Sequence, residues 1–282
     1  MKNSKRTATQ IILISIMVII CIIWIVPIVF LLGLSFQTQD AYSGAEFIFF
    51  PVGENFTFDN YTEILSDSGR LPILTWLTNS LIVSCSVSLL TVLLCSLSAY
   101  AFARMKFKAK GVMFSLMMAT MMVPGIISII PNFLTVSAMG LNDSLSALIF
   151  PCLGGVANVY LMRQFLYSIP RELDESAKID GAGNLSLFFR IIMPQMIPIL
   201  VVVALNSFLG SWNDLLWPII INSSTELNTM TSGLSMITSA YDRKYGIIAA
   251  ATIISAIPVL VVFMLAQKYI IKGISATSGM KE

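Results

Sequence analysis

Long stretches without a charged residue, separated by short charged ones, dominate the chain from residue 11 to residue 267. A helix needs about 20 mostly apolar residues to cross a bilayer. The chain is 56% hydrophobic and only 11% charged, whereas soluble domains carry about a quarter charged residues. The fold class expected is therefore an all-α membrane protein with six transmembrane helices. The expected spans are about 11–36, 72–103, 111–138, 144–166, 194–221 and 245–271.

Two of these spans need comment. The first apolar run is much longer than the 7–15 apolar residues of a cleaved signal peptide, so a retained span is expected. The third run contains Pro124-Gly125 and Pro131-Asn132 near its middle. Proline and glycine kink or break membrane helices, so this span is expected to be kinked or broken.

Lysine and arginine indicate the orientation, because they concentrate in cytoplasmic loops. With the N-terminus inside, every lysine and arginine except Arg70, Arg243 and Lys244 lies on the cytoplasmic side. Both termini are therefore expected in the cytoplasm. The expected organisation is an N-terminal segment 1–10, a transmembrane domain 11–273 and a tail 274–282. A large acidic loop 37–70 lies outside, and a large loop 167–193 lies inside.

Several functional classes are disfavoured by residues that the sequence lacks. It contains no histidine, the commonest general base and metal ligand, and its four cysteines show no metal-like spacing. No catalytic or metal site is therefore expected. A self-sufficient secondary transporter or channel for a small polar solute is one candidate function. Such proteins usually carry intramembrane charge networks or repeats, whereas here Asp214 alone interrupts an apolar run and no repeat is visible.

The inner loop reads as a helix, a glycine turn and a second helix. Ser168 is a plausible N-cap with Pro170 in the first turn. Gly181 suits the left-handed position that follows a helix. Asn184 is expected to cap the second helix, residues 185–193.

The first of these helices is too short to be stable alone. Leu173, Ser176 and Ala177 lie on one face, at helical spacing. Small residues on one face and acids on the other suit docking in a groove of a partner. An ordinary amphipathic loop at the membrane surface is the alternative.

The segment from Glu175 to Pro194 reads E-S-A, three residues, G, nine residues, I-x-M-P. It resembles the EAA motif of binding-protein-dependent ABC importer permeases, which reads E-A-A, three residues, G, nine residues, I-x-L-P. Ser176 and Met193 depart from that pattern by small or volume-conserving changes, which are well tolerated. Further strings resemble the maltose-type carbohydrate-uptake family, in its smaller-permease branch, over most of residues 72–273. They are 79–81, 99–104, 169–175, 179–182, 211–213 with Pro218, and 267–270 with Gly273.

This resemblance implies the type I ABC importer transmembrane fold, in a permease subunit that imports a sugar or oligosaccharide across a prokaryotic cytoplasmic membrane. Its implied partners are a second homologous permease, two ATP-binding subunits, an extracytoplasmic solute-binding protein and membrane lipid, with no nucleic acid. The chain has no G-x-x-x-x-G-K-[ST] phosphate loop. No cofactor is therefore expected in this chain, and ATP and Mg are expected on the partner ATPase.

The resemblance also assigns roles to residues. Loop 167–193 becomes the coupling loop, in which Glu175 pairs with a basic group of the ATPase and Gly181 sets the turn. The expected coupling residues are Glu172, Leu173, Glu175, Ser176, Ala177, Asp180, Gly181 and Pro194.

A second set of polar residues lies within the predicted spans. Asn158 and Asn206 either join helices by hydrogen bonds or line the sugar path. Asp214 has either a helix-end role or a role in the pore or gate. The candidates for the substrate path are Asn158, Asn206, Trp212, Asn213 and Asp214.

Overall fold

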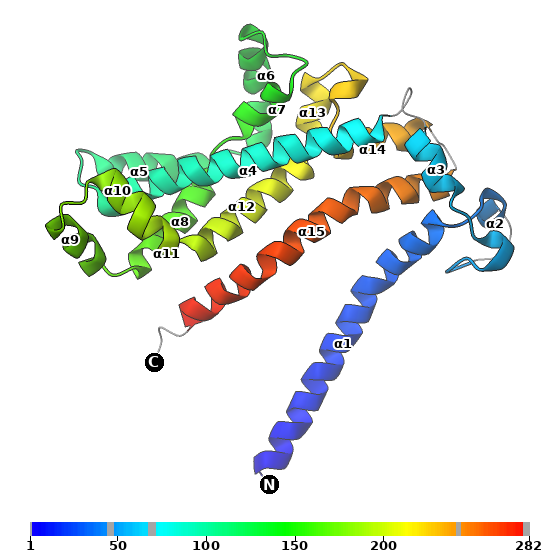
Figure 1. Cartoon of the computed structure of the whole chain (residues 1–282), viewed down its shortest axis with the longest axis horizontal. Helices are drawn as coiled ribbons and strands as arrows, with labels where there is room; N and C mark the ends of the chain where they lie inside the picture. Colours follow the sequence, from blue (N-terminus) through cyan, green and yellow to red (C-terminus); the bar gives the residue numbers. More distant parts are fainter. Residues whose placement is uncertain (1, 44–47, 67–71, 241–243, 279–282) are drawn as a thin grey trace. The chain divides into compact units, whose positions relative to one another are not determined.

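The computed structural model describes residues 2–43, 48–66, 72–240 and 244–278, and these residues form helices and no strand. An isolated antiparallel bridge joins Gln37 to Phe56. The outward basic residues Arg70 and Arg243 lie outside the described residues. The helices are α1 (Lys2–Ser35), α2 (Gln39–Ser43), α3 (Asp59–Ser66), α4 (Ile73–Arg104), α5 (Lys110–Ala119), α6 (Ile129–Ala138), α7 (Leu145–Ile149), α8 (Val156–Ser168), α9 (Glu172–Ile179), α10 (Asn184–Leu187), α11 (Met193–Gln195), α12 (Ile197–Trp212), α13 (Leu216–Ile221), α14 (Met230–Ala240) and α15 (Tyr245–Ser278) (Figure 1).

The chain divides into two compact units. The first comprises residues 1–73 and 234–256, and the second comprises residues 74–233 and 257–282. Three helices are long and apolar enough to cross a membrane by themselves: residues 10–35, 73–104 and 245–270. Three further spans result if each of three bent helix pairs is counted as one, which gives six.

In the first unit, the described part of loop 37–70 is folded rather than extended. The Phe36 ring packs against Phe56, Phe58 and Tyr61, with centroids 5.2, 5.3 and 5.0 Å away. Asn60 is buried and donates to the carbonyl oxygens of Ser35 and Gln37 at 3.0 and 2.9 Å. These contacts fix the end of α1 to α3, so part of the acidic loop expected at 37–70 is a small packed structure.

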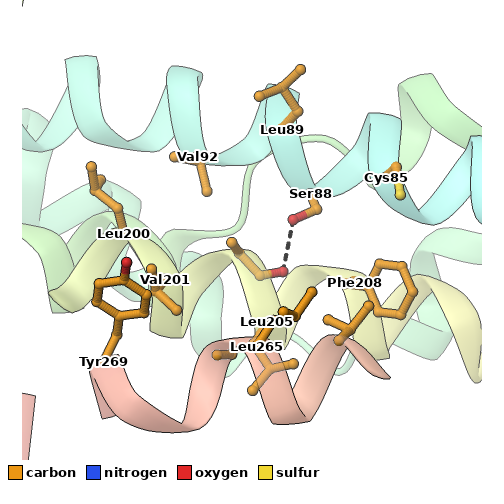
Figure 2. Close-up of a pocket in the computed structure, with 13 residues that line it drawn as sticks. Cys85, Ser88, Leu89, Val92, Leu200, Val201, Leu205, Phe208, Leu265 and Tyr269 are labelled. Carbon is orange, nitrogen blue, oxygen red and sulfur yellow. Dashed lines mark hydrogen bonds between the residues drawn. The ribbon is translucent and has the colours of Figure 1, made fainter. Parts of the chain in front are cut away.

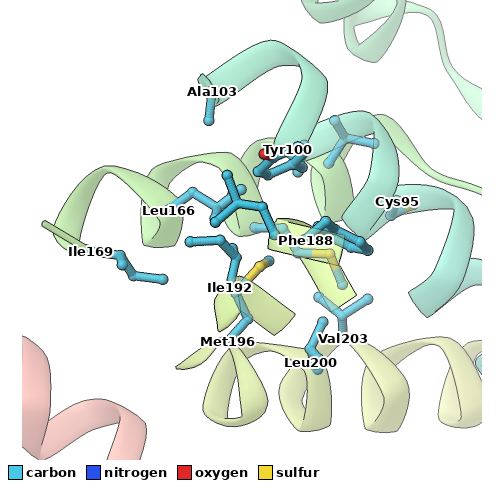
Figure 3. Packing of buried hydrophobic residues seen from close by; sticks show 14 of the residues in the cluster. Cys95, Tyr100, Ala103, Leu166, Ile169, Phe188, Ile192, Met196, Leu200 and Val203 are labelled. Atoms are coloured by element: carbon cyan, nitrogen blue, oxygen red, sulfur yellow. The ribbon is translucent and has the colours of Figure 1, made fainter. Parts of the chain in front are cut away.

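The larger core of the second unit lies where the C-terminal end of α4 meets the helices of loop 167–193. Buried side chains from α4, α8, α9, α10 and α12 form one continuous apolar cluster, centred on Phe188 (Figure 3). Phe188 is fully buried and packs against Tyr100 at a centroid distance of 5.1 Å. The helices of the inner loop are thereby part of the core of this unit and not a loose surface loop.

A smaller core in the second unit joins α4, α6, α7 and α13. Its largest side chain is Trp217, whose Nε1 donates to the Ala147 carbonyl oxygen at 2.8 Å. Nearby, the Asp143 carboxylate accepts hydrogen bonds from the backbone amides of Ser223 and Ser224. The connection after α6 is therefore fastened to the segment that follows α13.

Three of the expected spans contain sharp bends instead of running as single helices. The bends are 96° between residues 110–122 and 125–138, 49° between 145–152 and 156–168, and 82° between 184–195 and 197–212. The first bend occurs at Pro124, which lacks a backbone N–H. The second occurs at Gly154 and Gly155, whose φ angles of +99° and +109° suit glycine far better than other residues. The sequence predicts the first bend, and its division at Pro194 between the helix 185–193 and the following span lies close to the third bend. It does not predict the bend at Gly154 and Gly155.

Gly233→Ala tests the close packing of Gly233 against α4. A Cβ atom at this position would overlap the indole of Trp76, which is fully buried and donates Nε1–H to the Thr225 carbonyl oxygen at 2.6 Å. Overpacking of this kind costs about 1–3 kcal/mol, so we expect a lower Tm for the purified protein in detergent. Gly210→Ala is the control, because a Cβ atom there meets open space. Equal Tm values for the two variants would contradict the packing.

Candidate functional site

The helix α9 of the inner loop ends in a glycine turn with a complete set of backbone hydrogen bonds. Gly181 has a φ of +81°, in the left-handed region. Its amide donates to the Lys178 carbonyl oxygen at 3.0 Å, and the Ala182 amide donates to the Ala177 carbonyl oxygen at 2.9 Å. This pair of bonds is the Schellman arrangement. The left-handed position predicted for Gly181 is confirmed, and it fixes the direction in which the chain leaves α9.

The start of α9 differs from the prediction. Helix α8 continues through Ser168, whose hydroxyl donates to the Phe165 carbonyl oxygen at 2.7 Å. Ser168 is therefore the last residue of α8 and not the N-cap of the next helix. Helix α9 begins two residues after Pro170, at Glu172, and no side chain caps it. The prediction was wrong because the apolar face of α8 continues past the point where the charged loop was expected to begin.

The second segment of the loop is also less regular than predicted. Instead of one helix over 185–193, the structure has α10, a π-helical stretch Phe188–Ile192 and α11. Asn184, which was predicted to cap this helix, is instead the first residue of α10, and Gly183 occupies the N-cap position. A π-helical turn admits an extra residue, and here it places Phe188 and Ile192 fully in the core. Core packing therefore decides the backbone conformation at this point.

The two faces of α9 have different surroundings. Asp174 and Ala177 face inward, with 8% and 5% of their surface exposed. Glu172, Glu175, Ser176 and Asp180 are exposed, as are Gly181 and Pro194 in the following segments. Large apolar side chains share this outward surface: Leu173 is 37% exposed, Ile179 87% and Leu185 69%. The exposed face is thus acidic and apolar together, while the small residue Ala177 supports packing within the chain.

Arg104 joins this loop to the end of α4. Its Nε lies 3.5 Å from Oδ2 of Asp174, and both side chains are almost fully buried. Its Nη2 donates to the carbonyl oxygens of Leu166 and Ile169 at 2.9 and 2.6 Å. Sequence reasoning assigned neither residue to the site. The sequence does show Arg104 at the end of an apolar helix and Asp174 in the charged loop. It does not show that the two residues pair, because their contact depends on the tertiary structure.

The candidates for the substrate path fall into two groups. Asn158 donates to the Gly154 carbonyl oxygen at 3.2 Å and to Ser207 at 3.5 Å, and Trp212 is buried and stacked on Phe208. These residues pack helices within the chain. Asn206 and Asn213 are exposed on and after α12. The structure therefore does not bring the five candidates together into one polar pocket.

Asp214 lies between α12 and α13, where it is partly exposed. Its Oδ1 accepts a hydrogen bond from the Trp217 backbone amide at 3.3 Å. A carboxylate that accepts an amide in the first turn stabilises a helix start. The sequence left open a helix-end role and a pore or gate role for Asp214, and this contact corresponds to the helix-end role.

Residues 91–276 match a known family, which is described as "Binding-protein-dependent transport system inner membrane component". The chain belongs to this family. Its members are membrane components of transport systems, so the chain is a multi-pass transport subunit and not an enzyme. The matched region contains the C-terminal part of α4, from residue 91, and all of the inner loop.

Curated relatives cover most of the chain. The arabinooligosaccharides transport system permease protein AraQ of Bacillus subtilis (strain 168) is 33% identical over 225 residues, covering 80% of this chain and 79% of AraQ. The galactooligosaccharides transport system permease protein GanQ of the same organism is 32% identical, with 90% of each chain covered. The maltose/maltodextrin transport system permease protein MalG of Vibrio vulnificus is 34% identical, covering 74% of this chain and 73% of MalG.

A solved structure has the same fold. A bacterial ABC transporter involved in the import of the acidic polysaccharide alginate contains a chain that superposes with a TM-score of 0.83. The two chains are 21% identical, and the match covers 94% of this chain and 97% of the other. This permease therefore has the type I ABC importer transmembrane fold.

The permease also contains a cavity of about 480 Å³ between α4, α12 and α15 (Figure 2). Its lining is mostly aliphatic and aromatic, and the Ser88 hydroxyl donates to the Ala204 carbonyl oxygen at 2.8 Å. A sugar brings many hydroxyls that lose free energy when they are buried without hydrogen-bond partners. The cavity therefore lacks the polar lining of a carbohydrate site. Among the described residues, no group of three or more potential metal ligands occurs.

Gly181→Val tests the glycine turn of the permease. A Cβ atom at Gly181 meets no neighbour, so the substitution acts through the left-handed backbone alone. That conformation costs about 1–2 kcal/mol for a residue with a Cβ atom, and we expect faster proteolysis of the inner loop and a lower Tm. Gly181→Asn should be milder, because asparagine tolerates this region. Gly183→Ala is the control at a φ of −72°. A Gly181→Val protein as stable as Gly183→Ala would contradict the turn.

Proposed function

We propose that this permease carries a sugar or oligosaccharide into the cell, driven by ATP hydrolysis on separate subunits. The proposed assembly contains a second homologous permease, two ATP-binding subunits that hold ATP and Mg, and an extracytoplasmic solute-binding protein. The observation that carries the proposal is the family match over residues 91–276. That match includes an inner loop whose outward face is unusually apolar for a surface exposed to water.

The sugar class is supported by the relatives. The named substrates of AraQ, GanQ and MalG are arabinooligosaccharides, galactooligosaccharides and maltose or maltodextrin. The structurally similar transporter imports a polysaccharide, alginate. Since all of these substrates are short or long carbohydrates, we infer that this permease belongs to a carbohydrate importer.

The outward face of the inner loop supports ATPase coupling. Ile179 and Leu185 expose most of their apolar surface beside the acidic residues Glu172 and Glu175. Exposed apolar side chains rimmed by charges are typical of protein interfaces. We infer that α9 docks on an ATPase subunit, with Glu175 beside a basic group, and that ATP-driven closure of two such subunits moves the coupling loops as rigid bodies.

The broken span between α5 and α6 supports a second permease. Residues 121–128, around the 96° bend at Pro124, are exposed in the single chain. Non-helical backbone at membrane depth is tolerated only where protein or a water-filled path covers it. We infer that the second permease and the sugar path provide this cover, and that Asn206 and Asn213 line the path.

Transport by the purified components tests the function. We expect vesicles that contain the permease pair and the ATPase to accumulate an oligosaccharide when the solute-binding protein and ATP are supplied. Omission of the ATPase subunits should abolish uptake. Uphill uptake by the permease alone, without a nucleotide hydrolase, would instead identify a self-sufficient secondary transporter.

Glu175→Lys tests docking of α9. Reversal of this exposed charge would place two cations at the proposed contact, and like charges at an interface cost several kcal/mol. We expect uptake and the coupling of ATP hydrolysis to transport to be lost, while the protein still inserts into the membrane. The measurement is sugar uptake in vesicles with equal amounts of inserted permease.

Glu54→Lys is the matched control, because Glu54 is an exposed glutamate in the predicted outer loop. It changes the net charge by the same amount and should leave the coupling of ATP hydrolysis to transport unchanged. Normal uptake by Glu175→Lys would contradict the role of α9 in coupling.

A further inference from the structure

The buried contact between Arg104 and Asp174 is the only ion pair that the described residues of the second unit display. The two side chains expose 4% and 11% of their surface. Neither the Nε of Arg104 nor the Oδ1 of Asp174 has a hydrogen-bond partner among the described residues. Burying charges is expensive unless each is paired and hydrogen-bonded, so an incompletely satisfied pair at this position points to a role other than stability.

Arg104 belongs to one helix and contacts the ends of two others. It is the last residue of α4, its Nη2 holds the Leu166 and Ile169 carbonyl oxygens at the end of α8, and its Nε faces Asp174 on α9. The surrounding side chains are apolar and buried: Tyr100, Ala103, Leu166, Ile169 and Ala177. The guanidinium group therefore connects the end of a membrane-spanning helix to the first turn of α9.

We propose that Arg104 and Asp174 are positioning residues that transmit movement of α9 to α4 and α8. This inference rests on the proposed function, because it concerns how the docked loop acts on the membrane helices. The fork of the guanidinium group allows one side chain to hold two elements at once, whereas lysine presents a single point charge. A displacement of α9 must then displace the ends of α4 and α8 or break the buried pair.

The orientation of α9 makes this link effective. Adjacent residues on a helix point about 100° apart, so Asp174 faces the core while Glu175 faces outward. Force applied at the outer face reaches the inner face through one turn of helix. The Schellman turn after α9 and the buried Ala177 restrict rotation of the helix about its own axis.

The double variant Arg104→Met with Asp174→Leu separates positioning from stability. Replacement of a buried pair by apolar residues of similar volume is often neutral or stabilising, so the variant is expected to insert and to keep its Tm. We expect uptake to fall about tenfold and ATP hydrolysis to lose its dependence on the solute-binding protein. Arg104→Lys, which keeps the charge but loses the fork, should give a partial defect.

Lys106→Met is the matched control. It removes one exposed positive charge two residues after Arg104 and leaves the pair intact, so uptake should match the unmodified complex. Normal uptake and normal stimulation of ATP hydrolysis in the apolar double variant would overturn the proposal. If the unmodified complex itself shows no ATP-dependent uptake, the proposed function fails, which is a different result from failure of the link alone.

A distance measurement keeps the proposal testable if the double variant does not fold. Spin labels at Leu94 on α4 and Lys178 on α9, both exposed, are introduced after the four native cysteines are replaced by alanine. We expect the distance between them to be the same in nucleotide-free and nucleotide-trapped complexes. A second pair, Lys178 with Leu265 on α15, serves as the reference and should shift. A shift of the Leu94–Lys178 distance as large as that of the reference would overturn the link.

Discussion

The hydrocarbon core of the membrane is the constraint on which the rest of this structure depends. Lipid provides no hydrogen-bond partners, so each backbone amide within it must be satisfied by the chain itself. The described residues meet this requirement by forming helices. The helices are interrupted at residues whose backbone tolerates an interruption. Pro124 has no amide hydrogen to satisfy, and Gly154 and Gly155 adopt positive φ angles. The bends of 96° and 49° therefore arise where the backbone tolerates them.

Because the same constraint acts on the sequence, much of the fold can be predicted from it. The uncharged runs give α1, α4 and α15 almost directly, since a helix long enough to span a membrane leaves an unmistakable apolar stretch. The bend at Gly154 and the π-helical stretch Phe188–Ile192 leave no comparable signal. Their conformations are decided by tertiary packing, as the full burial of Phe188 and Ile192 shows.

The candidate site shows the same division between local and tertiary signals. The turn at Gly181 was predictable because glycine readily adopts the left-handed conformation that often follows a helix. The start of α9 was not predictable in the same way. Ser168 and Pro170 fit the sequence pattern of a helix start, but in the structure α8 continues through Ser168. Asp174 lies among the acids of the first turn of α9, yet it points inward to Arg104, about 70 positions earlier in the sequence. No local pattern contains that pairing.

These findings give a physical basis for the mechanical role proposed for the eight-residue helix α9. A helix of this length is not stable in isolation, so its position is set by what holds it. On the inner side it is held by Ala177, by the glycine turn and by the charged contact with Arg104. On the outer side it presents Glu175 and the exposed Ile179. A segment without stability of its own takes up the position that its two contact surfaces impose, and this makes it suitable for relaying movement from one surface to the other.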